Sequence, residues 1–250
     1  MTLLTIDFGN TLTKVDVWDD SGHLYHQQYS ETDDLARKIV KDFFNSRSID
    51  TVISGSVRSD RERVLEEIRA ISGVETIDFG KQIEEYYRSR IKYEGLPGAD
   101  RIAAYLGAAA IFPAQPLLIA DAGTALTLDV VNDRGEFCGG TISPGIFTRM
   151  KALNLNTSLL PLVDNLDKVP VFGYNTATAI ASGALMGAVS EVLFALERAK
   201  REYGVEKIVM TGGDASYMLP ILEKETGNIV YEPLLVAKGL REHYKGINLG

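Results

Sequence analysis

Two segments of this chain repeat each other at an offset of 114 residues. Residues 3–19 and 117–133 are identical at 8 of 17 positions, where chance agreement at ordinary composition is roughly one. Each copy has a short apolar run, an Asp-x-Gly turn and a second run of β-forming residues. This pattern predicts a β-hairpin followed by a third strand. Because one unit occurs twice, the chain is predicted to form two lobes on one plan.

The segments after each hairpin alternate between strand and helix patterns. After the first hairpin we expect a third strand at 23–29, a helix at 32–45, a strand at 51–54 and a helix at 59–71; after the second, a strand at 136–142, an Ala-rich helix at 176–203 and a strand at 207–210. The predicted fold class is therefore α/β, with duplicated βββαβα lobes and a cleft between them. We place the N-terminal lobe at residues 1–115 and the C-terminal lobe at residues 116–250.

Charge and composition exclude several classes of partner. The formal net charge is -8 and no basic run is present, which argues against a nucleic acid or an anionic membrane as partner. Residues 1–10 lack the features of a signal peptide, and we expect no stretch to reach the roughly 20 apolar residues that span a bilayer. The single cysteine, Cys138, allows no intrachain disulfide. We therefore expect a cytoplasmic protein, with His23, His26 and His243 at its surface.

The Asp-x-Gly turns suit an anionic ligand. Glycine lets the backbone approach a ligand and turn its N–H groups toward an anion, and Asn10, Thr11 and Lys14 add donors. One such turn is also an ordinary structural hairpin, but two copies favour a site. In a symmetric fold Asp7 and Asp121 would converge on one volume, where a cation must offset the two carboxylates. Magnesium carrying nucleotide phosphates meets this need, so the paired hairpins predict ATP.

This layout resembles the actin-like ATPase and kinase superfamily, which shares a ribonuclease H-like fold. There the two hairpins are phosphate loops, and a later Gly-Gly at a strand end contacts adenosine. The segment 211–214, Thr-Gly-Gly-Asp after an apolar strand, matches this third element. No Gly-x-x-x-x-Gly-Lys-Ser/Thr motif occurs, which argues against a P-loop NTPase. The resemblance thus implies actin-like lobes with a nucleotide cleft between them.

The order of motifs along nearly the whole chain resembles the type III pantothenate kinase family. The matching segments are Asp-x-Gly-Asn-Thr at 7–11, Gly-Ala-Asp-Arg at 98–101, Asp-x-Gly-Thr-Ala at 121–125, Gly-Gly-x-Ile-x-Pro-Gly at 139–145, Asn-Thr at 175–176 and Thr-Gly-Gly at 211–213. Gly-Ala-Asp-Arg is the specific mark, because sugar and acetate kinases share the hairpins but not this segment. Taken alone, Asp100 is equally well a helix cap, and Arg101 equally well the partner of a nearby carboxylate.

The resemblance implies phosphorylation of pantothenate by ATP to 4'-phosphopantothenate, the first step of coenzyme A biosynthesis. It assigns Asp100 as the catalytic base, and it implies ATP with Mg²⁺, a monovalent cation (K⁺ or NH₄⁺) at Asp121, and a homodimer. The implied ATP contacts are Asp7, Phe8, Gly9, Asn10, Thr11, Leu12, Thr13, Lys14 and Thr124. The implied pantothenate contacts are Tyr93, Gly98, Ala99, Asp100, Arg101 and Thr176.

Two positions depart from the family pattern. Leu12 stands where the phosphate turn usually continues with Asn, and the segment from Tyr93 to Gly98 is shorter than the family's usual spacing. The Ala-rich face at 103–110 suits either packing between subunits or a helix buried within one subunit. Two other functions stay open: a non-catalytic nucleotide-binding regulator, and a kinase of another small hydroxylated substrate on the same fold.

Overall fold

The computed structural model describes residues 1–30, 33–56 and 58–248. The chain forms two compact units. Unit 1 contains Met1–Phe112 together with the chain from Leu234 onward, and unit 2 contains Pro113–Pro233. Each unit is built around its own five-stranded sheet.

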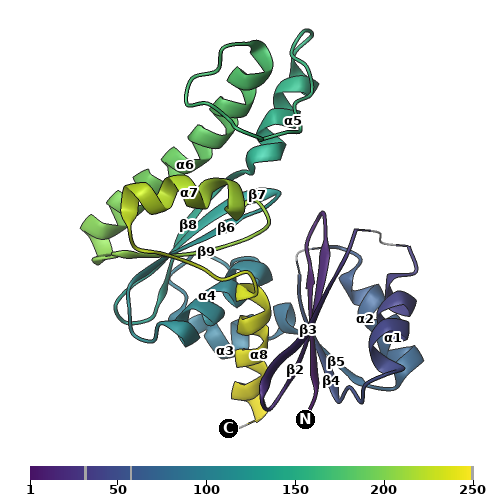
Figure 1. Ribbon diagram of the computed structural model, residues 1–250. Helices are drawn as coiled ribbons and strands as arrows, with labels where there is room; N and C mark the ends of the chain where they lie inside the picture. The colour runs from purple at the N-terminus through teal and green to yellow at the C-terminus, as the bar shows by residue number, and fades with distance from the viewer. Residues whose placement is uncertain (31–32, 57, 249–250) are drawn as a thin grey trace. The chain divides into compact units, whose positions relative to one another are not determined.

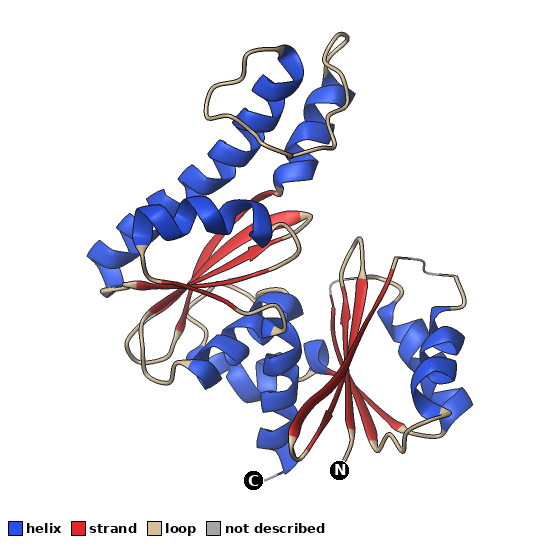
Figure 2. Cartoon of the chain, in the orientation of Figure 1, coloured by secondary structure: helices blue, strands red, loops and turns tan. Residues whose placement is uncertain are grey.

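Unit 1 is a sheet with helices on both faces (Figures 1 and 2). Its elements are β1 (Leu3–Phe8), β2 (Thr13–Asp19), β3 (Gly22–Tyr29), α1 (Leu35–Phe44), β4 (Thr51–Ser56), α2 (Arg61–Ser72), β5 (Glu75–Asp78), α3 (Ile83–Tyr87), α4 (Ala99–Ile111) and α8 (Leu235–Asn248). Apolar residues of β1, β2 and β4 pack against α1 and α2 in one core cluster. The opposite face receives α8, since a Cβ added at Gly55 would lie 2.9 Å from the Leu240 side chain.

Unit 2 contains the second sheet and the longest helix. Its elements are β6 (Leu117–Ala122), β7 (Ala125–Val131), β8 (Phe137–Pro144), α5 (Ile146–Asn156), α6 (Thr176–Tyr203), β9 (Lys207–Thr211), α7 (Ala215–Thr226) and β10 (Ile229–Tyr231). Residues from α5, α6 and α7 form one core cluster with β6 and β7. Within this unit, α5 and the first turns of α6 project beyond the sheet (Figure 1).

The two units repeat one sheet topology, as the internal repeat predicts. The strand order is β3-β2-β1-β4-β5 in unit 1 and, read in the same sense, β8-β7-β6-β9-β10 in unit 2. In both, the hairpin strands are antiparallel and the central strand pairs in parallel with the strand that follows a helix. The predicted α/β fold with duplicated units is confirmed. Helix α6 has its predicted bounds, while the predicted helix start at Thr32 lies outside the described residues.

The two hairpins differ by one residue in register. Asp7 lies opposite Lys14 in unit 1, whereas Asp121 lies opposite Thr127 in unit 2. The first turn therefore has four residues, 9–12, and the second has three, 123–125. Alignment of the two segments at the offset of 114 residues does not reveal this difference in turn length. Only the first hairpin consequently has a lysine paired with its aspartate.

Helix α8 packs in unit 1, whereas the division made from the sequence placed it in the second lobe. The reason is its close fit to α4. A Cβ added at Gly239 would lie 1.7 Å from the Ala103 carbonyl oxygen, and one added at Gly107 would lie 2.2 Å from the Leu235 carbonyl oxygen. The two helices thus touch backbone to backbone. Of the two alternatives for the Ala-rich face of α4, burial within one chain accounts for it.

Helix α6 is, among the described residues, the one helix long and apolar enough by length and composition to cross a membrane. The expectation that no stretch would meet this criterion was wrong. Core helices of water-soluble proteins meet it too, and α6 contributes Ile180, Ala184, Leu185, Ala188 and Val192 to the core of unit 2. Packing against the sheet accounts for its apolar composition.

His243 on α8 is buried, so its expected surface position was wrong. Its side chain is 1% exposed and lies among the rings of Phe79, Tyr86 and Tyr87. Nε2 donates to Gln82 Oε1 at 2.7 Å, and Nδ1 accepts from the Tyr87 hydroxyl at 2.8 Å. Both ring nitrogens are satisfied in the neutral form. Burial lowers the pKa of His243 from 6.5 to about 4.

We expect His243 to make unit 1 less stable in acid. The unfolded chain takes up the histidine proton near pH 6.5 and the folded chain only near pH 4, so this stabilisation is complete above pH 6.5 and is lost as pH falls toward 4. The loss is about 3 kcal/mol in the free energy of unfolding. The measurement is urea unfolding between these pH values for wild type and His243→Gln. The free energy of unfolding should depend less on pH in the variant than in wild type. An equal pH dependence in the two proteins would refute the effect.

Candidate functional site

The turn between β1 and β2 is a tight loop with an exposed tip. The Gly9 N–H donates to the Asp7 carbonyl at 3.1 Å, and a Cβ at Gly9 would lie 2.8 Å from the Leu12 carbonyl oxygen. Asn10 and Thr11 are exposed at the tip. The loop therefore presents polar side chains at the end of the sheet, where they can contact an anionic group.

The hairpin presents different residues on its two faces. Directly opposite residues of an antiparallel pair lie on the same face, which groups Asp7 with Lys14 and Phe8 with Thr13. Phe8 belongs to the core cluster under α1 and α2. Asp7 lies on the other face, the one that receives α8. The charged pair and the buried pair thus occupy opposite sides of one hairpin.

The Gly-Ala-Asp-Arg segment opens α4, as predicted. Gly98 is the N-cap, so Asp100 lies in the first turn, where the helix dipole favours a carboxylate. Its Oδ1 accepts the Arg101 N–H at 2.9 Å. Arg101 is 6% exposed, and its guanidinium carbon lies 5.5 Å from the centre of the Tyr93 ring. The structure thus brings together three of the residues assigned to the substrate.

Arg88 secures the loop that carries Tyr93, a contact that local sequence did not indicate. Its Nη1 donates to the carbonyl oxygens of Tyr93 at 3.1 Å and Gly95 at 2.9 Å. Gly95 has φ +74°, which glycine adopts without strain. The segment before Gly98 is therefore an ordered loop that Arg88 holds in place.

In unit 2 the second hairpin is joined to the start of α5. The Thr124 carbonyl accepts the Gly145 N–H at 3.0 Å and the Thr148 hydroxyl at 2.7 Å. A Cβ at Gly145 would lie 1.8 Å from the Gly123 carbonyl oxygen. The glycine that ends the motif at 139–145 is thus needed for close backbone approach to the turn that holds Thr124.

The Gly-Gly strand end lies beside this second hairpin. Gly212 has φ +95°, and the Asp214 N–H donates to the Ala122 carbonyl at 2.9 Å. Burial, and then the charge of Asp121, raise the pKa of Asp214 to about 6. Asp121 therefore has a second carboxylate near it. Local sequence gives no sign of this, because the two residues are 93 positions apart.

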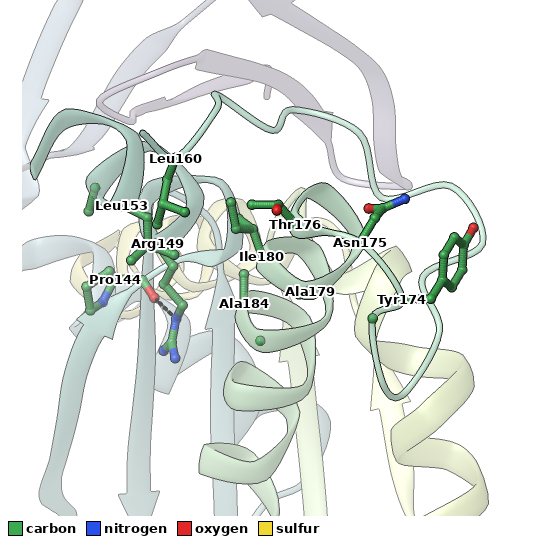
Figure 3. Close-up of a pocket in the computed structure, with 13 residues that line it drawn as sticks. Pro144, Arg149, Leu153, Leu160, Tyr174, Asn175, Thr176, Ala179, Ile180 and Ala184 are labelled. Atoms are coloured by element: carbon green, nitrogen blue, oxygen red, sulfur yellow. Dashed lines mark hydrogen bonds between the residues drawn. The ribbon is translucent and has the colours of Figure 1, made fainter. Parts of the chain in front are cut away.

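Unit 2 also contains a cavity of about 900 Å³ between α5 and the first turns of α6. Figure 3 shows Leu153, Leu160 and Ile180 at its wall, with Thr176 beside them. Asn175 caps α6 with a capping box, which orders this edge. The Arg149 side chain donates to the Pro144 carbonyl at 2.7 Å and pairs with Glu191 at 2.8 Å. The cavity is mainly apolar, with a few polar groups at its edge.

The predicted residues accordingly form two groups. Asp7 to Lys14, Tyr93 and Gly98 to Arg101 belong to unit 1, whereas Asp121, Thr124 and Thr176 belong to unit 2. Convergence of Asp7 and Asp121 on one volume stays a prediction. Among the described residues, no group of three or more His, Cys, Asp or Glu side chains is placed to hold a metal ion.

Comparison with known proteins agrees with the motif order. The family model for type III pantothenate kinase matches residues 3–198. The type III pantothenate kinase of Porphyromonas gingivalis is 39% identical over 146 residues, a match that covers 57% of this chain and 59% of that protein. That of Cytophaga hutchinsonii is 32% identical over 217 residues, covering 85% of this chain and 87% of that protein.

The fold is found in solved structures of low sequence similarity. A Baf family protein from Campylobacter jejuni superposes with a TM-score of 0.63 at 20% identity, covering 99% of this chain and 100% of the other. Together with the repeated sheet order, this likeness identifies the actin-like ATPase fold. Because the family model and the Cytophaga match each cover most of its length, the chain belongs to the type III pantothenate kinase family.

Proposed function

We propose that this chain transfers the γ-phosphoryl group of ATP to pantothenate, giving 4'-phosphopantothenate, the first step of coenzyme A biosynthesis. The observation that carries the proposal is the cluster at the start of α4, where the first turn holds Asp100 and the Arg101 guanidinium stacks on Tyr93. These residues lie within the segment matched by the family model. The match to the Porphyromonas protein spans about three fifths of that relative, at 59% of its length.

Asp100 accepts the proton of the pantothenate hydroxyl. Phosphoryl transfer passes through a loose transition state, so the protein mainly aligns the hydroxyl, accepts its proton and stabilises phosphate charge. Arg101 binds the pantothenate carboxylate, where its planar guanidinium makes directional bonds. Tyr93, Gly98, Ala99 and Thr176 complete the substrate contacts.

The two hairpins bind ATP. Of the residues from Asp7 to Lys14, the exposed tip at Asn10 and Thr11 and the Lys14 ammonium contact its phosphates, and Thr124 contributes from the second hairpin. Phe8 and Thr13 are each 1% exposed, so these two residues support the turn instead of contacting the nucleotide. Mg²⁺ carried by the nucleotide would neutralise phosphate charge there. Leu12 contributes only its backbone to this contact, since its side chain lacks the donor that Asn supplies in the family.

A monovalent cation, K⁺ or NH₄⁺, binds at Asp121. The neighbourhood fits a positive ion, because Asp121 and the half-buried Asp214 place two carboxyl groups at one strand edge. Backbone carbonyls of the adjoining turn are the other ligands that such an ion prefers. Bound there, the cation would offset the negative charge of the carboxylates and of the nucleotide phosphates.

The test is coupled ADP release from purified protein with ATP and Mg²⁺, with and without pantothenate, and with K⁺, NH₄⁺ or neither. Release that needs pantothenate and rises with K⁺ or NH₄⁺ supports the kinase. ATP binding without pantothenate-dependent turnover supports the nucleotide-binding regulator instead. Turnover with another hydroxylated acid, but not with pantothenate, supports the other-substrate kinase. The net charge of -8 argues against nucleic-acid and membrane partners, and we place the enzyme in the cytoplasm as a proposal.

We further propose that the protein is a homodimer that uses the projecting end of unit 2. The last turn of α5 and the segment between α5 and α6 expose several large apolar side chains, which are the usual mark of an interaction surface. They are Leu155, Leu159, Leu162, Val171, Phe172 and Tyr174, exposed by 58% to 92%. The cavity beside Thr176 adjoins this segment.

Phe172→Asp should convert the dimer to a monomer. Phe172 is 88% exposed, so a carboxylate there leaves the folded chain intact but cannot be buried against a second copy without a large desolvation cost. The measurement is molar mass by light scattering across a concentration series. Leu24→Asp, at a residue 50% exposed in unit 1, is the control and should keep the wild-type mass. A monomeric wild type, or a dimeric Phe172→Asp, would contradict the proposal.

A further inference from the structure

Arg58 occupies a largely but not fully buried position beside the first hairpin. It follows β4, and its side chain is 11% exposed. Its Nε and Nη2 donate to the two carboxylate oxygens of Asp60, at 2.8 Å and 2.6 Å. This two-point pairing fixes the plane of the guanidinium. It also holds the pKa of Asp60 below its usual value.

The remaining groups of Arg58 contact the hairpin. Nη1 donates to the Thr13 hydroxyl at 3.1 Å, and the guanidinium carbon lies 5.6 Å from the centre of the Phe8 ring. Phe8 is the last residue of β1 and Thr13 the first of β2, so they flank the turn on both sides. Arg58 therefore joins the two ends of the loop at the point where they diverge.

The face on which Arg58 lies decides what it can do. Phe8 and Thr13 are opposite each other in the ladder, and Phe8 packs into the core under α1 and α2. Asp7 and Lys14 lie on the other face. Arg58 thus supports the hairpin from the side away from its charged pair, and the Asp60 carboxylate already offsets its charge. Arg58 is therefore better placed to affect ATP binding by holding the hairpin than by contacting a phosphate group itself.

We propose that Arg58 is a positioning residue for ATP, holding the ends of the 9–12 turn in the geometry that receives the nucleotide phosphates. The proposal rests on the proposed kinase function of the hairpin. Without Arg58, the turn would have to be ordered when ATP binds, and the cost of ordering weakens ATP affinity. The substrate segment that begins at Gly98 makes no use of this contact, so pantothenate affinity should not change.

The test compares Arg58→Ala and Arg58→Lys with a matched control, Arg47→Ala. Arg47 lies in the same unit, has its guanidinium 4.8 Å from the centre of the Tyr25 ring, and donates to the Ser46 hydroxyl at 3.1 Å. It therefore has the same kinds of contact but none to the hairpin among the contacts described. Arg58→Ala should raise the KM for ATP by roughly tenfold, while the KM for pantothenate stays within about twofold. Arg47→Ala should change neither.

Arg58→Lys should give an intermediate KM for ATP, because lysine keeps the charge but lacks the planar fork. Thr13→Val removes the hydroxyl at the other end of the bond. In a double-mutant cycle, Arg58→Ala and Thr13→Val should together raise the KM for ATP by less than the product of their separate effects. A role confined to stability would instead lower the melting temperature and leave the KM for ATP unchanged, which would overturn the proposal.

Calorimetric titration with ATP separates this proposal from the kinase assignment. If wild type binds ATP but does not turn over pantothenate, the kinase assignment fails, yet a roughly tenfold weaker Kd for ATP in Arg58→Ala still supports positioning. If wild type turns over pantothenate and Arg58→Ala keeps the wild-type Kd and KM for ATP, only the Arg58 proposal fails. If Arg58→Ala does not fold, the Kd and the KM for ATP of Arg58→Lys decide whether the Arg58 proposal holds. Failure of wild type to bind ATP refutes both.

Discussion

Asp100→Asn should lower kcat for pantothenate-dependent ADP release by about 100- to 10,000-fold, the usual contribution of a general base. The amide has nearly the shape of the carboxylate but cannot accept the hydroxyl proton. It can still accept the Arg101 N–H that Oδ1 accepts at 2.9 Å, so α4 should keep its structure. The KM for ATP should change by less than about threefold, because the hairpins are untouched.

The matched control is Asp50→Asn. Asp50 Oδ2 accepts the Thr2 N–H at 2.7 Å in the same unit, so this variant changes a carboxylate with a similar backbone contact outside the proposed site. It should keep wild-type kcat. If Asp100→Asn keeps more than about a tenth of wild-type kcat, Asp100 is not the catalytic base. Its role is then only to stabilise the N-terminus of α4, which its position in the first turn also permits.

Gly239→Ala should reduce the free energy of unfolding of unit 1 by about 3 kcal/mol or more. The added methyl would lie 1.7 Å from the Ala103 carbonyl oxygen and 2.6 Å from its carbonyl carbon, and backbone atoms within a helix cannot move aside. Helices α4 and α8 must then separate, which opens the core between them. Because α4 begins with the segment that holds Asp100 and Arg101, kcat/KM for pantothenate should fall as well.

Gly246→Ala is the control on the same helix. A Cβ at Gly246 would meet no atom within 4 Å, and the residue is exposed. Alanine there should raise stability by up to about 1 kcal/mol, since it favours the helical state more than glycine does. Urea unfolding followed by circular dichroism measures both variants. If Gly239→Ala and Gly246→Ala were equally stable, α4 and α8 would have to lie farther apart than in the structure.

Local pattern predicted much of the fold because the determining signals lie within short segments. The two hairpins, the apolar helix 176–203 and the start of α4 at Gly98 follow from turn residues and periodicity, and the structure has them. The predicted site residues were found by the same kind of signal, since Asp-x-Gly and Gly-Ala-Asp-Arg are contiguous motifs. Their roles stay proposals.

Contacts between distant segments were not predictable in this way. The edge strands β5 and β10 are short, at four and three residues, and carry little periodicity of their own. Asp214 lies near Asp121, and Arg58 reaches Thr13, only because parallel pairing places the ends of separate strands side by side. The burial of His243 depends on α3, whose sequence position is more than 150 residues away.

The sequence by itself determined that this chain has two copies of one α/β unit, which motifs each copy carries, and to which family they belong. Tertiary structure alone decided that α8 returns to unit 1, that the two hairpins differ by one residue in register, and that an arginine outside every motif contacts Thr13 at the end of the first turn. The physical reason is that turn and strand signals act over a few residues, whereas backbone contact between helices and pairing between strand ends depend on packing that the whole unit must form together.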